Sequence, residues 1–161
     1  MSKKRTKYQQ VVTILALLFL IGTCLFLIIY WPHIPSRIPG HYDGAGKITR
    51  LDPKWTIFFL PILALVFYLF FAVIEKNPAL WSLPREVTPK NKTYLDGITK
   101  DLIVTMKLLV VSIFCYLTIN NAFAKDLSPY FLPVVVGFLF LATLIYLIRS
   151  LLCDILPSST F

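Results

Sequence analysis

Four long apolar runs dominate the pattern of hydrophobic and polar positions along this chain. They cover residues 11–30, 55–74, 102–122 and 131–148, and the polar residues gather between them. A helix rises about 1.5 Å per residue, so roughly 20 apolar residues cross a hydrocarbon core about 30 Å thick. Spanning β-strands would be about 10 residues long and would alternate in polarity, which these runs do not do. The pattern therefore predicts an all-α fold, an integral membrane four-helix bundle.

The composition agrees with this reading. Of 161 residues, 57% are hydrophobic and 15% are charged, and the mean hydropathy is +0.74. Soluble domains contain about 45–50% apolar and about 25% charged residues. A water-soluble globule, a disordered tail, a collagen and a disulfide scaffold are thereby excluded. The cysteines, Cys24, Cys115 and Cys153, lie in apolar stretches without ligand spacing, and we interpret them as small hydrophobic side chains.

The distribution of basic residues predicts how the helices are oriented. The formal net charge is +8, and most of the Lys and Arg residues lie in the N-terminal tail and in the loop between the second and third runs. Because cytoplasmic loops are rich in Lys and Arg, we predict a multi-pass protein of the inner or plasma membrane with both termini in the cytoplasm. No basic run is interleaved with exposed aromatic residues, so we expect no nucleic-acid partner.

The runs divide the chain into four predicted segments. These are a cytoplasmic basic tail (1–10), a domain with the first two helices and the loop 31–54 (11–77), a cytoplasmic loop (78–101), and the last two helices with a C-terminal tail (102–161). Several prolines interrupt the cytoplasmic loop, so we expect irregular backbone lying on the membrane surface there.

A lysine inside the third run, Lys107, allows three interpretations. Side chains on a helix lean toward its N-terminus, so Lys107 can extend to the cytoplasmic headgroups, which is the interpretation we favour. Glu75, at the end of the second run, could instead pair with Lys107 or with Arg149. A role in transport is the third interpretation, because ionisable residues inside spans often mark transport pathways.

The third run also carries a polar stripe. Its members are spaced as one face of a helix, and they are Ser112, Cys115, Tyr116 and Asn120. Small and polar residues commonly line the seams between membrane helices, so we expect a helix-packing face. A face that meets a ligand or a partner is the alternative. Four short spans also expose much lipid-facing surface, which leaves oligomerisation open.

The loop between the first two runs does not have the composition of a random linker. It contains four prolines, which restrict φ, and three glycines, which permit positive φ: Pro32, Pro35, Pro39, Pro53, Gly40, Gly44 and Gly46. Asp43-Gly44 is a strong turn pair. We therefore expect an ordered extracytoplasmic loop, with a stiff extended entry, a tight turn and a short segment leading to Trp55.

The same loop holds four side chains of metal-ligand type, His33, His41, Asp43 and Asp52. Imidazole and carboxylate groups suit zinc or another divalent cation, but the spacing matches no ligand signature that we recognise. A simpler interpretation is that His41 and Asp43 hydrogen-bond the backbone of their own turn. No hydroxyl or thiol nucleophile stands beside a base in a catalytic motif. We therefore expect no catalytic residue, no cofactor and no resident metal.

The central part of this loop resembles a known family. It reads Ile34-Pro35-Ser-Arg37-Ile38-Pro39-Gly-His41-Tyr42-Asp43-Gly-Ala-Gly46, and Lys54 precedes the second span. This is similar to a bacterial membrane domain of unknown function found at the N-terminus of SdpI-type immunity proteins, which protect bacteria from a sporulation-delaying toxin. The resemblance runs from the first span through Asn77-Pro78. Lys47 and Thr49 depart from the pattern, because acidic residues stand at both positions in the family.

The resemblance implies a multi-pass membrane binding protein for toxin or bacteriocin immunity or resistance. The loop 31–54 would recognise a peptide toxin or a membrane-protein partner, and it would be shaped by Pro35, Arg37, Pro39, His41, Asp43, Gly46 and Lys54. Four basic and two acidic residues give this loop a positive charge, which favours acidic partners or anionic lipid headgroups. The alternatives are a small membrane transporter or transporter subunit and, less favoured, a metal-dependent membrane enzyme.

Overall fold

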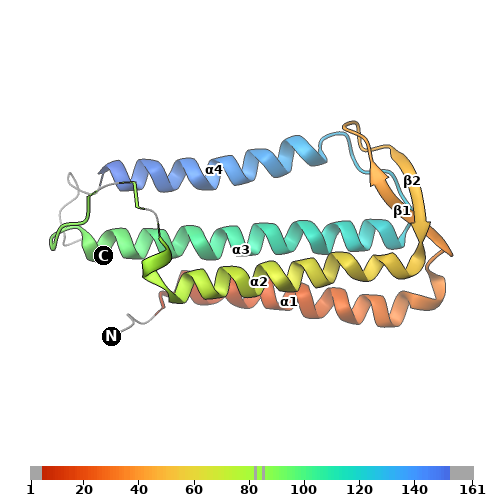
Figure 1. Cartoon of the computed structure of the whole chain (residues 1–161), viewed down its shortest axis with the longest axis horizontal. Coiled ribbons are helices and arrows are strands. Elements are labelled where there is room, and N and C mark those ends of the chain that lie inside the picture. Colours follow the sequence, from red (N-terminus) through yellow and green to blue (C-terminus); the bar gives the residue numbers. More distant parts are fainter. Residues whose placement is uncertain (1–4, 82, 85, 153–161) are drawn as a thin grey trace.

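Four helices run side by side in the computed structural model, which describes residues 5–81, 83–84 and 86–152 (Figure 1). They are α1 (Lys7–Tyr30), α2 (Phe59–Lys76), α3 (Lys92–Ala122) and α4 (Phe131–Leu151). Each is part of a helical segment long and apolar enough to cross a membrane, so the prediction of four helices of membrane-spanning length is confirmed. Lys3 and Lys4 of the predicted tail, Cys153 and the C-terminal tail lie outside the described residues.

The first and third helices begin earlier than the apolar runs. At the start of α1, Thr6 accepts a hydrogen bond from the backbone N–H of Gln9, whose side chain accepts one from the N–H of Thr6. This reciprocal capping box satisfies two backbone donors at a helix start. Helix α3 begins at Lys92, so the prediction of irregular backbone up to residue 101 is wrong for residues 92–101. These turns are helical because Leu95 and Ile98 are buried against α4, a partner that a search for apolar runs does not reveal.

The segment between α1 and α2 forms a β-hairpin, which corrects the expectation of an all-α chain. Strand β1 (Arg37–Tyr42) pairs antiparallel with β2 (Ile48–Pro53), and the register shifts between Pro39 and Tyr42. A 3-10 turn, Trp31–His33, leads out of α1, and another, Lys54–Phe58, leads into α2. The hairpin lies across one end of the helices, beside the loop that joins α3 to α4 (Figure 1). We call this end of the molecule the hairpin end.

Helix α3 is central to the packing, because it contacts α1, α2 and α4. Among the buried side chains, Leu20 of α1 and Ala64 of α2 meet Val111 and Cys115 of α3. Large apolar side chains on all four helices are exposed, and α4 is the least buried of the four. Such a surface is stable in contact with lipid rather than water.

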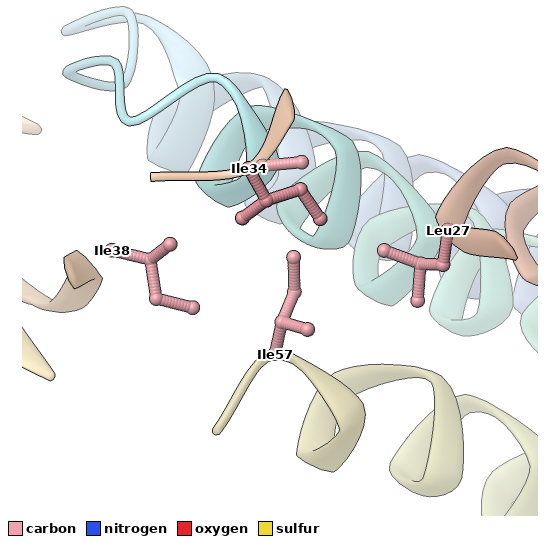
Figure 2. Close-up of a cluster of buried hydrophobic side chains, with 5 residues drawn as sticks. Leu27, Ile34, Ile38 and Ile57 are labelled. Carbon is pink, nitrogen blue, oxygen red and sulfur yellow. The ribbon is translucent and has the colours of Figure 1, made fainter. Parts of the chain in front are cut away.

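An apolar cluster joins the hairpin to the helices. It consists of Leu27, Ile34, Ile38, Ile57 and Ala122, each at most 5% exposed. Figure 2 shows the side chains of Ile34, Ile38 and Ile57 converging on one another beside Leu27. These residues come from α1, its exit, β1, the entry to α2 and the end of α3, so burial of one cluster seats the base of the hairpin on the bundle.

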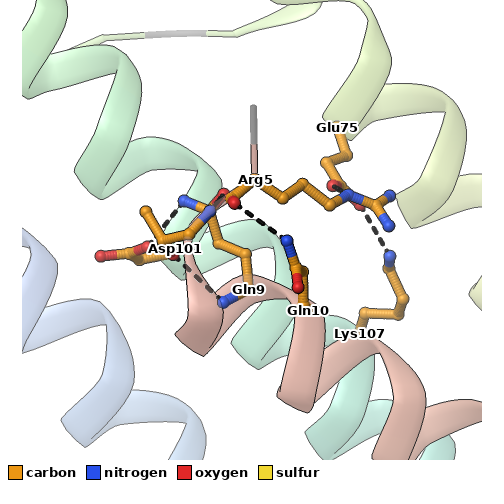
Figure 3. A network of polar contacts seen from close by, with 7 residues as sticks. Arg5, Gln9, Gln10, Glu75, Asp101 and Lys107 are labelled. Carbon is orange, nitrogen blue, oxygen red and sulfur yellow. Dashed lines mark hydrogen bonds and ion pairs between the residues drawn. The ribbon is translucent and has the colours of Figure 1, made fainter. Parts of the chain in front are cut away.

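At the opposite end, a network of charged and polar side chains ties the helices together (Figure 3). The Nζ atom of Lys107 lies 2.8 Å from Oε2 of Glu75, and Nε of Arg5 lies 2.7 Å from Oε1 of the same carboxylate. Lys107 is fully buried, so the prediction that it reaches the headgroups is wrong, and the alternative ion pair with Glu75 is found. Arg149 pairs with Asp101, at 3.0 Å, rather than with Glu75.

Candidate functional site: the hairpin surface

The turn of the hairpin is built around Asp43. Its Oδ1 atom accepts hydrogen bonds from the backbone N–H groups of Ala45, at 2.9 Å, and Lys47, at 2.8 Å. The backbone N–H of Gly46 donates to the carbonyl of Asp43, and Gly46 has a φ of +83°. The predicted hydrogen bonding of Asp43 within its own turn is thus confirmed, and these contacts pre-shape the tip.

The tip is held against the loop between α3 and α4. The carbonyl of Gly46 accepts a hydrogen bond from the N–H of Leu127, at 2.8 Å. A Cβ atom on Gly46 would lie 2.5 Å from the carbonyl oxygen of Leu127. Glycine is required here for two reasons, the positive φ and the close approach of the two backbones.

The carboxylate of Asp126 provides a second contact at the tip. It accepts hydrogen bonds from the N–H of Ile48 and from Nζ of Lys47, both at 2.9 Å. These two donors lower the pKa of Asp126, the backbone N–H first, and Asp126 in turn raises the pKa of Lys47. Both side chains face solvent, so the ion pair itself contributes little, and we assign more weight to the bond that orders the backbone.

The end of α3 holds the first strand. The Nδ2 atom of Asn121, a buried residue, donates to the carbonyl of Pro39 at 3.0 Å, and its Oδ1 accepts from the hydroxyl of Tyr42 at 2.6 Å. Asn120 donates to the same hydroxyl, at 3.1 Å. Partial burial raises the pKa of Tyr42, which keeps the phenol in its protonated, hydrogen-bonding form.

Several side chains of the hairpin take no part in these contacts and are exposed. They are His41, Thr49, Arg50 and Leu51, which lie on both sides of the ribbon because successive strand residues alternate, and we call this exposed set the outward face. Nδ1 of His41 lies 2.6 Å from Oγ1 of Thr49, so the prediction that His41 bonds the turn backbone is wrong. Arg50 donates to both carboxylate oxygens of Asp52, each at 3.0 Å. The face therefore offers one imidazole, one hydroxyl, one partly neutralised guanidinium and one apolar side chain.

The four side chains considered as metal ligands are engaged separately. The ring of His33 stacks on Tyr30, with 5.2 Å between ring centroids. His41 bonds Thr49, Asp43 bonds its turn, and Asp52 bonds Arg50. In the part of the chain that the structure describes, no three His, Cys, Asp or Glu side chains come together as metal ligands would.

The polar stripe on α3 faces several neighbours rather than one. Cys115 is buried between α1 and α2, while Tyr116 stacks on Phe131 of α4 with 5.1 Å between ring centroids. Ser112 donates to a carbonyl of its own helix, and Asn120 reaches the hairpin. Only the last of these four residues contributes to the site described above.

The remaining predicted residues lie at the base of the hairpin. Pro39 is buried, whereas Pro35 and Arg37 are exposed. Nζ of Lys54 lies over the ring of Trp31, 4.4 Å from its centroid. Sequence reasoning missed Asn121, Asp126 and Leu127, which hold the hairpin. Two features of the sequence could have indicated them, the amide of Asn121 at the end of an apolar run and the carboxylate of Asp126 in a short loop.

Comparison with known proteins gives one match. Residues 18–65 match DUF1648, a domain of unknown function. The matched region ends at residue 65, whereas the resemblance seen in the sequence extends through Asn77-Pro78. No curated protein and no solved structure matches the chain. The chain is thus similar to DUF1648 over the second part of α1, the whole hairpin and the start of α2.

Proposed function

We propose that this chain is a membrane binding protein of the toxin-immunity kind, and that the outward face of the hairpin recognises the partner. One observation carries the proposal. The hairpin is held to the bundle by Asn121, Asp126 and Leu127, while the side chains of His41 and Leu51 stay exposed. A surface that is ordered before binding loses little conformational entropy on contact, which favours recognition.

The proposal includes an orientation in the membrane. The hairpin end lies outside the cell and both termini lie in the cytoplasm, since basic residues concentrate near the other end. Exposed Trp55 and Tyr130 at the hairpin end support an interfacial position, because such aromatic rings favour the headgroup level. The partner would then be a secreted peptide toxin, or a membrane protein with an acidic external segment that suits the positive loop.

Binding without catalysis is part of the same proposal. The side chains nearest to catalytic type, His41 and Asp43, are engaged by Thr49 and by the turn backbone. In these positions they stabilise the shape of the hairpin. We assign His41 and Thr49 to the recognition surface and Asp43 to the frame beneath it.

Protection of a sensitive bacterium tests the proposal. The chain is expressed in a host that is killed by peptide toxins of neighbouring strains, and survival is compared with the empty host. We expect survival with the wild type and its loss with Leu51→Asp or His41→Ala at equal amounts in the membrane. Phe140→Leu, on an exposed position of α4, is the matched control and should protect. Equal killing with and without the chain across the toxins would contradict the proposal.

A second candidate, transport, draws on the buried charges of Lys107 and Glu75. Ionisable residues inside membrane spans often mark pathways for ions or protons. Uptake into proteoliposomes decides between the candidates. A saturable flux that Lys107→Met abolishes would favour transport, whereas protection from toxin without flux would favour immunity.

A further inference from the structure

A large apolar groove lies between α1 and α2 toward the hairpin end. Its volume is about 900 Å³, within the range of roughly 300–1,000 Å³ that ligand pockets show. Its lining is almost wholly apolar, and it includes Cys24, Ile28, Trp31, Phe58, Ile62 and Leu65. We call it the α1–α2 groove. It is a lipid-facing recess, since α1 and α2 are both packed on α3 and carry exposed apolar side chains on either side of it.

The mouth of the groove carries a positive charge. The rings of Trp31 and Phe58 stack there, with 5.1 Å between centroids. Above Trp31 stands the ammonium group of Lys54, 4.4 Å from the ring centroid. The neighbouring strand begins with the exposed Arg37, opposite Pro53. The backbone of Arg37 therefore lies across the strand pair from the residue that precedes Lys54.

No carboxylate neutralises Lys54 among residues 5–81, 83–84 and 86–152. Asp52 is the closest acidic residue along the chain, and both of its carboxylate oxygens accept from Arg50. The ammonium group thus has an aromatic neighbour and an unused capacity for an anion. A cation held between an aromatic ring and an apolar recess is a site for an amphiphile with a negative head.

We propose that the α1–α2 groove and Lys54 form a binding site for an anionic phospholipid. The acyl chain lies in the groove between α1 and α2, and the phosphate meets the ammonium group of Lys54. A purely apolar helix would fill the recess but would leave this charge without a counter-ion. The site goes beyond recognition by the outward face, because it lies at the base of the hairpin and on the side of the helices.

Native mass spectrometry of the full-length chain in detergent tests the site. The probes are phosphatidylglycerol and phosphatidylcholine with the same acyl chains. We expect the wild type to retain one phosphatidylglycerol at about fivefold lower concentration than phosphatidylcholine, from the attraction of one lysine to an anionic headgroup. Lys54→Gln should lose this preference. Lys125→Gln is the matched control, because Lys125 lies at the same end and over a different ring, Phe123.

A second pair of variants tests the apolar part of the site. Ile62→Trp should fill the groove and weaken the retention of both lipids, whereas Leu69→Trp, on an exposed position of α2 outside the groove, should not. Equal retention of the two lipids by the wild type would overturn the proposal. A preference for phosphatidylglycerol that survives in Lys54→Gln would overturn it as well. A lipid-free dimer would also overturn it, because it would show that a second chain fills the groove.

Discussion

The hydroxyl oxygen of Tyr42 lies 2.6 Å from Oδ1 of Asn121, although 79 positions separate the two residues in the chain. This contact joins the first strand of the hairpin to the last turn of α3. Asn121 also bonds the carbonyl of Pro39. One amide side chain therefore satisfies a carbonyl and a hydroxyl of the same strand, and it fixes the height of the hairpin above the bundle.

We predict that Asn121→Ala destabilises the protein by about 1–3 kcal/mol, because the carbonyl of Pro39 is left buried without a donor. Tyr42→Phe should cost a similar amount, about 1–3 kcal/mol, because it leaves Oδ1 of the buried Asn121 without its donor. The free energy of unfolding in detergent micelles measures both. Equal stability of Asn121→Ala and wild type would show that Asn121 does not hold the strand.

We predict that Gly46→Ala releases the hairpin tip from the loop between α3 and α4. The positive φ costs an L-residue roughly 1–2 kcal/mol, and the new methyl group would meet the carbonyl of Leu127. Faster amide exchange at residue 127 measures the release. Gly44→Ala is the matched control, because a Cβ atom there has nothing within 4 Å. Similar exchange in the two variants would contradict the role of Gly46.

We predict that the contact of Asp126 with the tip is lost in acid. Its pKa is lowered from 3.8, so its contribution is complete above 3.8 and disappears as the pH falls through the lower folded value. The pKa of Lys47 is raised from 10.5, so its contribution is present below 10.5 and disappears only as the pH rises through the higher folded value. Between these limits the contact is insensitive to pH.

Spin labels at Ala45 and Ser128, in a chain without native cysteines, measure this dependence as a distance distribution. The distribution should be narrow at neutral pH and broaden in acid. The distance distribution of the Asp126→Ala variant should be broad at every pH. A wild-type distribution that stays narrow in acid strong enough to protonate Asp126 would show that Asp126 contributes nothing to the contact.

The apolar parts of the helices could be predicted from the sequence because each needs only its own apolar residues, whereas the first turns of α3 and the hairpin could not. Pro39 lacks an N–H donor and Gly40 has a weak preference for strands, so β1 does not have a strand-like pattern. The strand exists because Ile38 is buried at its base and Asn121 bonds Pro39. Both contacts come from distant segments, which a local pattern does not contain.

The same limit explains the misjudged position of Lys107. The sequence shows that Lys107 lies inside an apolar run. Its pairing with Glu75, however, depends on where α2 ends. Glu75 is buried in the last turn of α2 and meets Lys107 from the neighbouring helix. The turn at Asp43 could be predicted, in contrast, because the hydrogen bonds of Asp43 connect it with Ala45, Gly46 and Lys47, all within four positions along the chain.

We predict that Glu75→Gln destabilises the protein more than Lys107→Met does. The first change leaves a fully buried ammonium group without its carboxylate, which costs about 3–5 kcal/mol. The second leaves Glu75 paired with Arg5. The double variant should therefore be more stable than Glu75→Gln alone. Additive losses in the same unfolding assay would contradict a direct pair.

Amide hydrogen exchange of the full-length chain in lipid nanodiscs tests most directly whether the hairpin is a fixed surface. The N–H of Ile48 bonds Asp126 and the N–H of Leu127 bonds Gly46, so both should exchange slowly in the wild type. Asp126→Ala should speed the exchange of the N–H of Ile48, and Gly46→Ala should speed that of the N–H of Leu127. Exchange of both amides at the rate of an unstructured peptide in the wild type would contradict the account, because the outward face would then have no fixed shape to present.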